Sequence, residues 1–325
     1  MGNRNFGSAR PEFEPGNHPF DTAEYALPTP SIQAGLEKVV SVIRNRRPGA
    51  MFTAMQRTGK THAIMFWKAY IALELGMPIP IFIMSMHEFD RAGEAAFFEL
   101  LLESVGHSLL NGISSVLRRR LNDFLCARAV SAKQRKVVLF IDEAQKLQEI
   151  HYAWLVDLTN DLSQRGIILT IFLVGQPELI HRRDAFILSK RLEYLGRFMA
   201  ESFRLRGLRS EADVKSVLHG YDESEYPSGS SWTFTRFFFP TAFENGWRLS
   251  ESAKEVWRAF AEVIEANGFE KDIPMDHFTL TVEQVLRSHS DLDTASPNLS
   301  LAIWLAAIRE SGFRDAGRYR NDYKS

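Results

Sequence analysis

The sequence contains one cysteine, Cys126, among its 325 residues. A single cysteine cannot build a disulfide framework, which excludes the small disulfide-stabilised secreted scaffolds and favours a reducing compartment. Long apolar stretches are missing as well, because no run approaches the roughly 20 residues that a membrane-spanning helix needs. The first residues also lack the apolar core of a signal peptide. We therefore expect a cytoplasmic protein with no membrane partner.

An excess of charge of either sign is also missing, since 39 basic and 40 acidic residues give a formal net charge of −1. Contact with nucleic acid must then come from a local basic patch rather than from the field of the whole molecule. The remaining composition, 45% hydrophobic and 24% charged residues, is that of an ordinary globular protein. The length allows one large domain or two modest ones.

Residues 54–61 approach the phosphate-loop pattern G-x-x-x-x-G-K-[ST], with Ala54 in place of the first glycine. In this pattern backbone N–H groups and a helix start bind phosphate oxygens. Lys60 would reach the β- and γ-phosphates, and the hydroxyl of Thr61 would bind Mg²⁺. Alanine would add strain if its position needed a positive φ angle. The pattern predicts ATP as cofactor, bound by a loop that comprises Ala54, Gln56, Arg57, Thr58, Gly59, Lys60, Thr61 and His62.

Because Gly-Lys-Thr also occurs by chance before helices, a second nucleotide motif is needed, and residues 137–143 supply it. Five apolar residues precede Asp142 and Glu143, a run typical of a strand buried on both faces of a parallel sheet. Ligands bind at the carboxyl ends of such strands. We expect Asp142 to bind Mg²⁺ together with Thr61 and Glu143 to polarise the attacking water, as in an ATPase. A buried strand that merely ends in acidic residues is the weaker alternative.

Two more apolar runs, at 79–86 and 167–175, alternate with segments of helical spacing, whereas no buried-strand run follows residue 207. This order predicts an α/β fold in which a parallel sheet is flanked by helices and followed by a helical lid. The expected divisions are an extended arm at 1–27, a nucleotide-binding α/β domain at 28–207, a helical lid at 208–313 with an aromatic insertion at 221–247, and a charged tail at 314–325.

Three further features leave alternatives open. Gln176 follows the 167–175 run and is placed to sense a γ-phosphate, although it can equally be a turn residue bonded to local backbone. Thr29-Pro30 begins a helix that either borders the nucleotide base or only packs. A path for DNA would need basic side chains aimed at phosphates, and a charge run is more often a solvated helix face. The candidates for DNA contact are Arg118, Arg119, Arg120 and Lys146.

The order of these motifs resembles the AAA+ ATPases. Within them it is most similar to the transposition regulators TnsC and TniB, with the ExeA-type secretion ATPases as relatives. The resemblance covers about residues 28–207, and it is carried by Thr29-Pro30, residues 57–61, residues 141–145 (Ile-Asp-Glu-Ala-Gln), residues 175–179 (Gly-Gln-Pro-Glu-Leu) and residues 196–198.

The resemblance implies an ATP-dependent regulator of DNA transposition that forms a hexameric or heptameric ring, or a filament, on duplex DNA. It would link a target-selector protein to a transposase and hydrolyse ATP with Mg²⁺. It also implies that Arg197 contacts the ATP of a neighbouring subunit, because a guanidinium stays charged and binds phosphate oxygens bidentately. Arg191 is the competing candidate, and either arginine can instead form a surface ion pair.

The lid departs from the family pattern. The helix that begins near residues 297–299 has no arginine where many AAA+ proteins place a second sensor, and Arg309 lies nearly three turns later. This favours a slow, switch-like ATPase. Two alternatives remain: an ExeA-like ATPase that acts on protein assemblies without DNA, and a nucleotide-binding structural protein without turnover.

Overall fold

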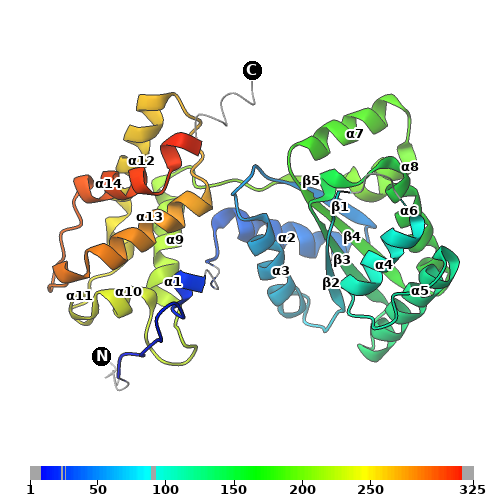
Figure 1. Cartoon of the computed structure of the whole chain (residues 1–325), viewed down its shortest axis with the longest axis horizontal. Helices are drawn as coiled ribbons and strands as arrows, with labels where there is room; N and C mark the ends of the chain where they lie inside the picture. The colour runs from blue at the N-terminus through cyan, green and yellow to red at the C-terminus, as the bar shows by residue number, and fades with distance from the viewer. Residues whose placement is uncertain (1–8, 23–24, 26, 89–92, 317–325) are drawn as a thin grey trace. The chain divides into compact units, whose positions relative to one another are not determined.

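The computed structural model describes residues 9–22, 25, 27–88 and 93–316. The chain divides into two compact units: residues 31–205, here the α/β unit, and residues 1–30 together with 206–325, here the helical unit (Figure 1). The sequence predicted a boundary between residues 207 and 208. The chain passes from the α/β unit to the helical unit between residues 205 and 206, close to that position. Within the described ranges, no helix is both long enough and apolar enough to span a membrane.

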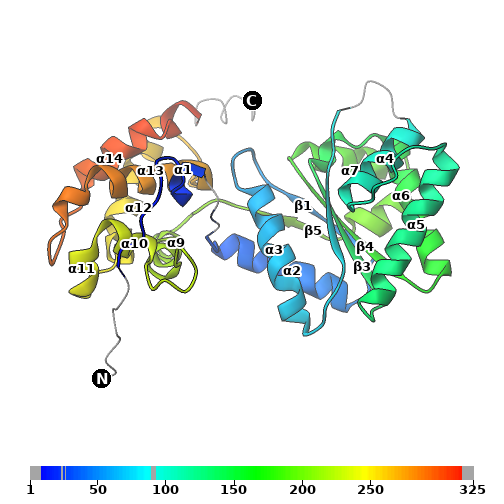
Figure 2. The same cartoon turned by 60° about the horizontal axis from the view of Figure 1, so that its bottom comes forward.

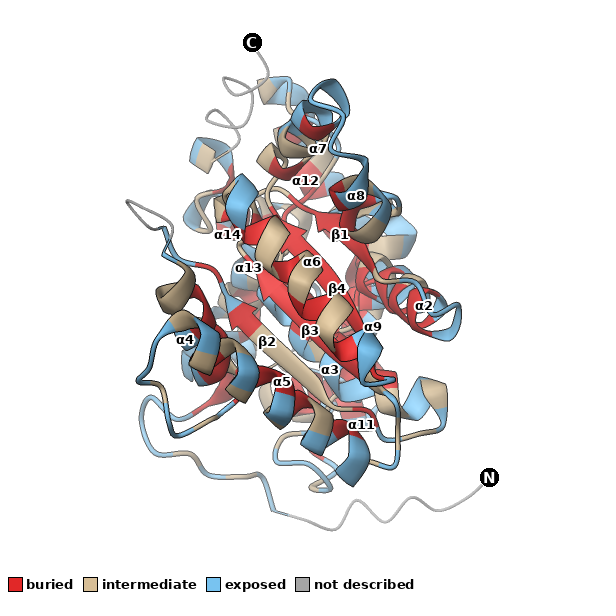
Figure 3. Cartoon of the chain, turned by 90° about the vertical axis from the view of Figure 1, so that its right-hand side faces the viewer, coloured by how far each residue is buried: buried red, intermediate tan, exposed pale blue. Residues whose placement is uncertain are grey.

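The α/β unit is built on a five-stranded sheet with the order β2-β3-β4-β1-β5, in which every neighbouring pair is parallel. The predicted parallel α/β sheet is therefore confirmed. The central strands β1, β3 and β4 are buried along almost their whole length, as continuous apolar runs require (Figure 3). The strands are β1 (Gly49–Thr53), β2 (Ile81–Ser85), β3 (Lys136–Asp142), β4 (Ile168–Gly175) and β5 (Ser202–Arg204).

Helices cover both faces of this sheet, α2 and α3 on one side and α4, α5 and α6 on the other (Figures 1 and 2). Because side chains alternate along a strand, Phe52 packs in the α2–α3 core and its neighbour Met51 in the α4–α6 core. The helical segments are α2 (Pro30–Arg44), α3 (Lys60–Leu75), α4 (Glu94–Ser104), α5 (Ser114–Ser131), η1 (Ala144–Lys146), α6 (Glu149–Gln164), α7 (Glu178–Leu188), α8 (Leu192–Tyr194) and the π-helical turn η2 (Leu195–Met199).

The register of the strands positions the site. Ser85 pairs with Asp142 and Thr53 pairs with Gly175, so the carboxyl ends of four strands meet at one edge of the sheet. The loops that follow these strands hold the predicted nucleotide residues. This edge is where open parallel sheets bind ligands.

The helical unit has a core of its own, which includes Phe260, Phe278 and Trp304. Its described part contains helices and two isolated β-bridges but no strand, in agreement with the expected helical region. The helices are α1 (Pro19–Thr22), α9 (Glu211–Glu223), α10 (Phe234–Phe238), α11 (Pro240–Glu244), η3 (Leu249–Ser252), α12 (Ala253–Asn267), α13 (Met275–Ser288), η4 (Ser290–Leu292) and α14 (Leu301–Glu310).

The described part of the N-terminal segment packs on the helical unit instead of extending away from it. Phe20 is buried and stacks on Phe234 and Phe238, which belong to the predicted aromatic insertion. Asp21 forms an ion pair with Arg287 at 2.8 Å. Stacking and burial thus attach this segment to the aromatic side chains of α10. Its polar, Pro- and Gly-rich sequence does not predict this contact.

Candidate functional site

The phosphate loop connects β1 to α3, and its left-handed residues differ from those that the sequence suggested. Ala54 does not have a positive φ angle, so the strain considered for this alanine is absent. The positive φ angles fall on Arg57, at 59°, and on Gly59, at 90°, the residue that caps α3. The backbone N–H of Ala54 donates to the carbonyl of Gly175 at 3.0 Å. The loop is thus anchored to the end of β4 and turns sharply just before Lys60.

Lys60 lies under the loop with only 8% of its surface exposed. Its Nζ is 3.5 Å from the carbonyl oxygen of Met55, a long contact. Burial lowers the pKa of Lys60, and nearby carboxylates act in the opposite direction; they belong to Glu143, Asp142 and Glu178. A buried cation with so weak a local acceptor is suited to bind an anion in this loop.

Thr61 and Asp142 lie side by side, as the magnesium prediction requires. The Thr61 hydroxyl donates to Asp142 Oδ2 at 2.8 Å, and Asp142 Oδ1 accepts from the backbone N–H of Glu143 at 2.9 Å. A hydroxyl and a carboxylate fit Mg²⁺, which takes few protein ligands and completes its shell with water and phosphate oxygens. Among the described residues, no cluster of three or more His, Cys, Asp or Glu side chains is suited to a metal by itself. These two side chains would hold Mg²⁺ jointly with a nucleotide.

Glu143 is held by its own neighbours. Its backbone is left-handed, with φ 54° and ψ 36°, and it caps the turn η1. Its Oε2 accepts a hydrogen bond from Gln145 Nε2 at 2.8 Å and lies 3.6 Å from Lys146 Nζ. Lys146, a candidate for DNA contact, therefore pairs with the proposed catalytic carboxylate.

Gln176 meets the phosphate loop. Its Oε1 accepts from Gln56 Nε2 at 3.1 Å, and its backbone N–H donates to Gln145 Oε1 at 3.0 Å. Gln145 therefore joins Glu143 to Gln176, and Gln176 in turn accepts from Gln56. Sequence reasoning did not select Gln145 as a site residue, although Gln145 belongs to residues 141–145, which carry the family resemblance.

The other loop candidates have different environments. Gln56, Arg57, Thr61 and His62 are exposed, whereas Thr58 is buried. Thr29 and Pro30 belong to the helical unit, so their contact with a nucleotide base stays a prediction.

Arg197 lies at the opposite edge of the sheet from the phosphate loop. A Cβ built on Gly49 would come within 3.0 Å of the Arg197 carbonyl oxygen, which places η2 at the start of β1. The loop follows the other end of this strand, about 13 Å away at roughly 3.3 Å per residue. The Arg197 guanidinium donates to Thr159 Oγ1 at 3.1 Å and to Asn160 Oδ1 at 2.9 Å. Both oxygens that accept from this guanidinium are therefore uncharged.

Arg191 has a different partner. Its Nη2 lies 2.7 Å from Glu149 Oε1, and both side chains are nearly half exposed. This is the surface ion pair that the sequence left open as an alternative for either arginine.

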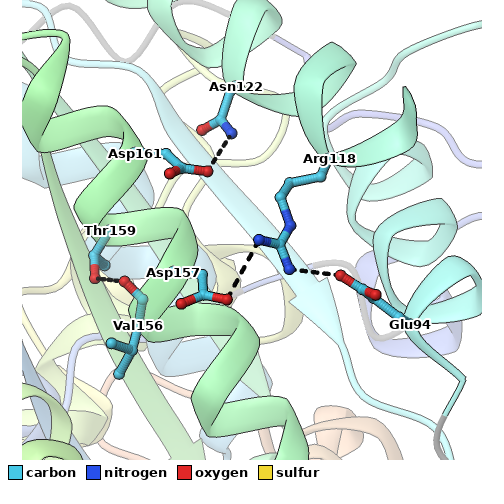
Figure 4. Close-up of polar contacts among 7 residues, drawn as sticks. All are labelled: Glu94, Arg118, Asn122, Val156, Asp157, Thr159 and Asp161. Carbon is cyan, nitrogen blue, oxygen red and sulfur yellow. Dashed lines mark hydrogen bonds and ion pairs between the residues drawn. The ribbon is translucent and has the colours of Figure 1, made fainter. Parts of the chain in front are cut away.

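The arginine run on α5 is largely engaged within the α/β unit. Arg118 pairs with Glu94 of α4 at 2.5 Å and with Asp157 of α6 at 3.3 Å (Figure 4). Arg120 Nη1 donates to the carbonyl oxygens of Leu109 and Asn111, at 2.8 and 3.2 Å. Arg119 is exposed. Of these three arginines, Arg119 is the one for which the described residues show no such contact.

A hollow of about 500 Å³ lies beside Arg118. Its lining mixes charges of both signs, with Arg119 and Arg165 opposed by Glu94 and Asp161. Asn122 Nδ2 donates to Asp161 Oδ2 at 3.1 Å inside it (Figure 4). None of its lining residues belongs to the phosphate loop, and the mixed charge selects no class of ligand.

Comparisons with known proteins bear on the fold of this unit. Residues 44–182 match the family model described as an AAA domain. No curated protein matches the sequence significantly. The structure of the Aeropyrum pernix ORC2 protein in ADPNP–ADP complexes is similar to the chain, with a TM-score of 0.53, 14% identity, and coverage of 91% of this chain and 72% of that chain.

Two other structures are less similar. Drosophila ORC bound to DNA has a TM-score of 0.48 at 14% identity, covering 87% of this chain and 67% of that chain. CDC6P from Pyrobaculum aerophilum has a TM-score of 0.43 at 12% identity, covering 89% and 82%. Of the three, only the ORC2 structure exceeds a TM-score of 0.5, and at 14% identity it establishes the fold alone. The matched segment is similar to an AAA domain, and the architecture is that of the AAA+ α/β fold.

Proposed function

We propose that the protein hydrolyses ATP at the edge of the sheet formed by the ends of β1, β3 and β4. The observation that carries the proposal is the contact of Thr61 with Asp142, directly beside Glu143 and the buried Lys60. Lys60 would bind the β- and γ-phosphates, and Thr61 and Asp142 would hold Mg²⁺, which would supply positive charge beside the phosphate oxygens. Glu143 polarises the water that attacks the γ-phosphorus, and ADP and phosphate leave.

The position of Arg197 supports action as an oligomer. An arginine at the amino end of β1 is remote from its own phosphate loop, so a role at the nucleotide requires a second copy. Bonds to neutral oxygens leave its positive charge uncompensated, whereas the charge of Arg191 is balanced by Glu149. Arg197 is therefore the better candidate for the arginine that acts in trans. Such an arginine contributes about 10³–10⁵ to the rate in P-loop GTPases.

We further propose that the assembly is a hexameric or heptameric ring, or a filament, on duplex DNA, and that it regulates transposition by linking a target selector to a transposase. The order of the motifs supports this, above all residues 141–145 and 175–179. Of the arginine run, exposed Arg119 is the residue free to meet a phosphate.

A second candidate is an ATPase that acts on protein assemblies without DNA. The specific observation in its favour is the engagement of Arg118 and Arg120 within the chain, because phosphate-binding arginines need free N–H groups. Lys146 likewise faces Glu143. These contacts remove three of the four side chains that the sequence offered for DNA.

Mass-resolved sizing separates the two candidates. The protein is measured in ATP, in a non-hydrolysable analogue and in ADP, each with and without duplex DNA, and Lys60→Ala is the control that cannot bind phosphate. Assemblies that form on DNA only with the triphosphate support the transposition regulator. Nucleotide-driven oligomers that ignore DNA support the protein-directed ATPase. A chain that stays monomeric in every state contradicts both.

A further inference from the structure

The side chain of Gln145 bridges two strand ends. Its Oε1 accepts the backbone N–H of Gln176 after β4, and its Nε2 donates to Glu143 Oε2 after β3. Both partners fix the orientation of the amide, because an N–H group can only donate and a carboxylate can only accept. If the amide were flipped, its NH₂ group would face the backbone N–H of Gln176 and its oxygen would face the carboxylate of Glu143. Neither pair can form a hydrogen bond. The bridge therefore has one orientation.

Two backbone features bring Gln145 to this place. The left-handed conformation of Glu143 turns the chain from β3 into η1, at a cost of roughly 1–2 kcal/mol for a residue with a Cβ. Gly175 then allows η1 to approach the end of β4: a Cβ on Gly175 would lie 2.6 Å from Gln145 Oε1 and 3.1 Å from its backbone nitrogen. A side chain at position 175 therefore cannot coexist with the bridge.

The bridge leaves one oxygen of Glu143 open. Gln145 and Lys146 both approach Oε2, and the described residues place no hydrogen-bond donor on Oε1. A carboxylate held by one oxygen presents the other in a fixed direction. That arrangement suits a base that must meet a water molecule in line with the γ-phosphorus.

We propose that Gln145 is a positioning residue: it aims the Glu143 carboxylate and fixes its distance from Gln176, so that the residue facing the γ-phosphate and the residue facing the water keep one geometry. The inference rests on the proposed ATP hydrolysis and goes beyond it, because Gln145 carries no role in the phosphate loop or the magnesium pair. The competing explanation is that Gln145 only stabilises the turn η1.

Steady-state ATP hydrolysis and nucleotide affinity, measured on the full chain, distinguish the two explanations. Gln145→Ala loses both hydrogen bonds, and we expect kcat to fall about tenfold or more, part of the roughly 10²–10⁴ that a positioned base contributes. The Kd for a fluorescent ATP analogue stays within about twofold, because no phosphate contact is removed. A residue that only stabilises the turn would change the thermal midpoint and the affinity together.

Gln145→Glu is the sharper variant, because it keeps the oxygen that accepts from Gln176 and replaces the donor to Glu143 by a second carboxylate. Two carboxylates at this distance cannot both ionise without repulsion. We therefore expect Gln145→Glu to lower kcat as Gln145→Ala does, because it loses the donor that aims Glu143 even though it keeps an acceptor for the N–H of Gln176. Gly175→Ala leaves both side chains chemically intact and displaces the bridge, so it should reproduce the low kcat.

Gln284→Ala is the matched control. Gln284 is a glutamine of α13 in the helical unit, and its side chain donates to Ser288 and Glu310. This variant should keep kcat within about twofold.

Parental kcat in Gln145→Ala or in Gln145→Glu overturns the positioning role while ATP hydrolysis stands. Loss of nucleotide binding in Gln145→Ala supports the explanation that Gln145 only stabilises η1. That result also overturns the positioning role. Absence of hydrolysis in the parent protein itself overturns the proposed function, and the positioning role with it. The parent assay thus separates the two failures.

Discussion

Lys60 is suited to bind phosphate, but burying its charge lowers the free energy of unfolding of the empty protein. Burial lowers its pKa from the ordinary value of 10.5, so the folded protein binds a proton at this site less readily than the unfolded chain does. Below the folded-state pKa the lysine is charged in both states, and the full cost of burying its charge is present. Between the two pKa values the unfolded chain binds more protons, so the free energy of unfolding rises with pH.

Replacing this charge should therefore stabilise the empty protein. We expect Lys60→Met to raise the free energy of unfolding by about 1 kcal/mol at neutral pH, the usual gain when a functional strain is removed. The advantage over the parent should shrink as the pH approaches 10.5. Denaturant titrations of both proteins without nucleotide, at several pH values, measure the difference. A variant less stable than the parent at neutral pH contradicts this account.

Glu143 offers the second residue-scale prediction. Glu143→Gln keeps the size of the side chain and can still meet the amide of Gln145, but it cannot accept a proton from water. We expect phosphate release to fall by about 10²–10⁴ while nucleotide-driven assemblies persist longer than those of the parent. Phosphate release and sizing in ATP test both parts. Hydrolysis at the parental rate would show that Glu143 is not the base.

At the scale of secondary-structure elements, the arginines of α5 have separate roles. Arg118 ties α5 to α4 and α6 through two carboxylates and is 27% exposed. Its neighbour Arg119 lies on the exposed side of the same helix. A single run of three arginines is thus divided between packing and solvent.

This division predicts opposite effects of two neighbouring substitutions. Arg118→Ala should lower the free energy of unfolding by about 1 kcal/mol, as the loss of a partly buried ion pair does. Its DNA affinity should keep the parental salt dependence. Arg119→Ala should leave stability unchanged and, if the chain binds DNA through this residue, reduce the slope of log K against log salt by about 1. An unchanged slope in Arg119→Ala removes α5 from the DNA-binding surface.

The elements also show what the sequence can and cannot predict. Continuous apolar runs predicted the buried strands β3 and β4. The run at 79–86, predicted as a buried strand, contains β2 at Ile81–Ser85, but β2 lies at the edge of the sheet and is mostly half-buried. The ends of β3 and β4 followed from the same runs, so the neighbourhood of Glu143 and Gln176 was predictable. The bridge by Gln145 was not, because it depends on the left-handed backbone of Glu143 and on the register of two strands. The partners of Arg118 lie 24 and 39 residues away, beyond any local pattern.

At the scale of the whole molecule, the two opposite edges of the sheet carry different parts of the proposed site. One edge carries the phosphate loop and Glu143, and the other carries Arg197 beside the start of β1. In the proposed oligomer, these two edges would be the complementary halves of a heterologous interface, the kind that builds rings or filaments. Each active centre would then use Glu143 from one copy and Arg197 from the next.

Mixing two inactive variants tests this arrangement. Arg197→Ala keeps its own Glu143, whereas Glu143→Gln keeps an arginine that it can supply to a neighbour. Each variant alone should be nearly inactive, but an equal mixture should recover about a quarter of the parental rate, because in a random heterologous assembly that fraction of interfaces joins an intact Glu143 to an intact Arg197. Phosphate release from the mixture, with the order of assembly varied, measures the recovery. Arg191→Ala is the matched control and should keep its own activity, since its partner is Glu149. A mixture no more active than its components would mean that Arg197 has only the intramolecular role seen in its bonds to Thr159 and Asn160.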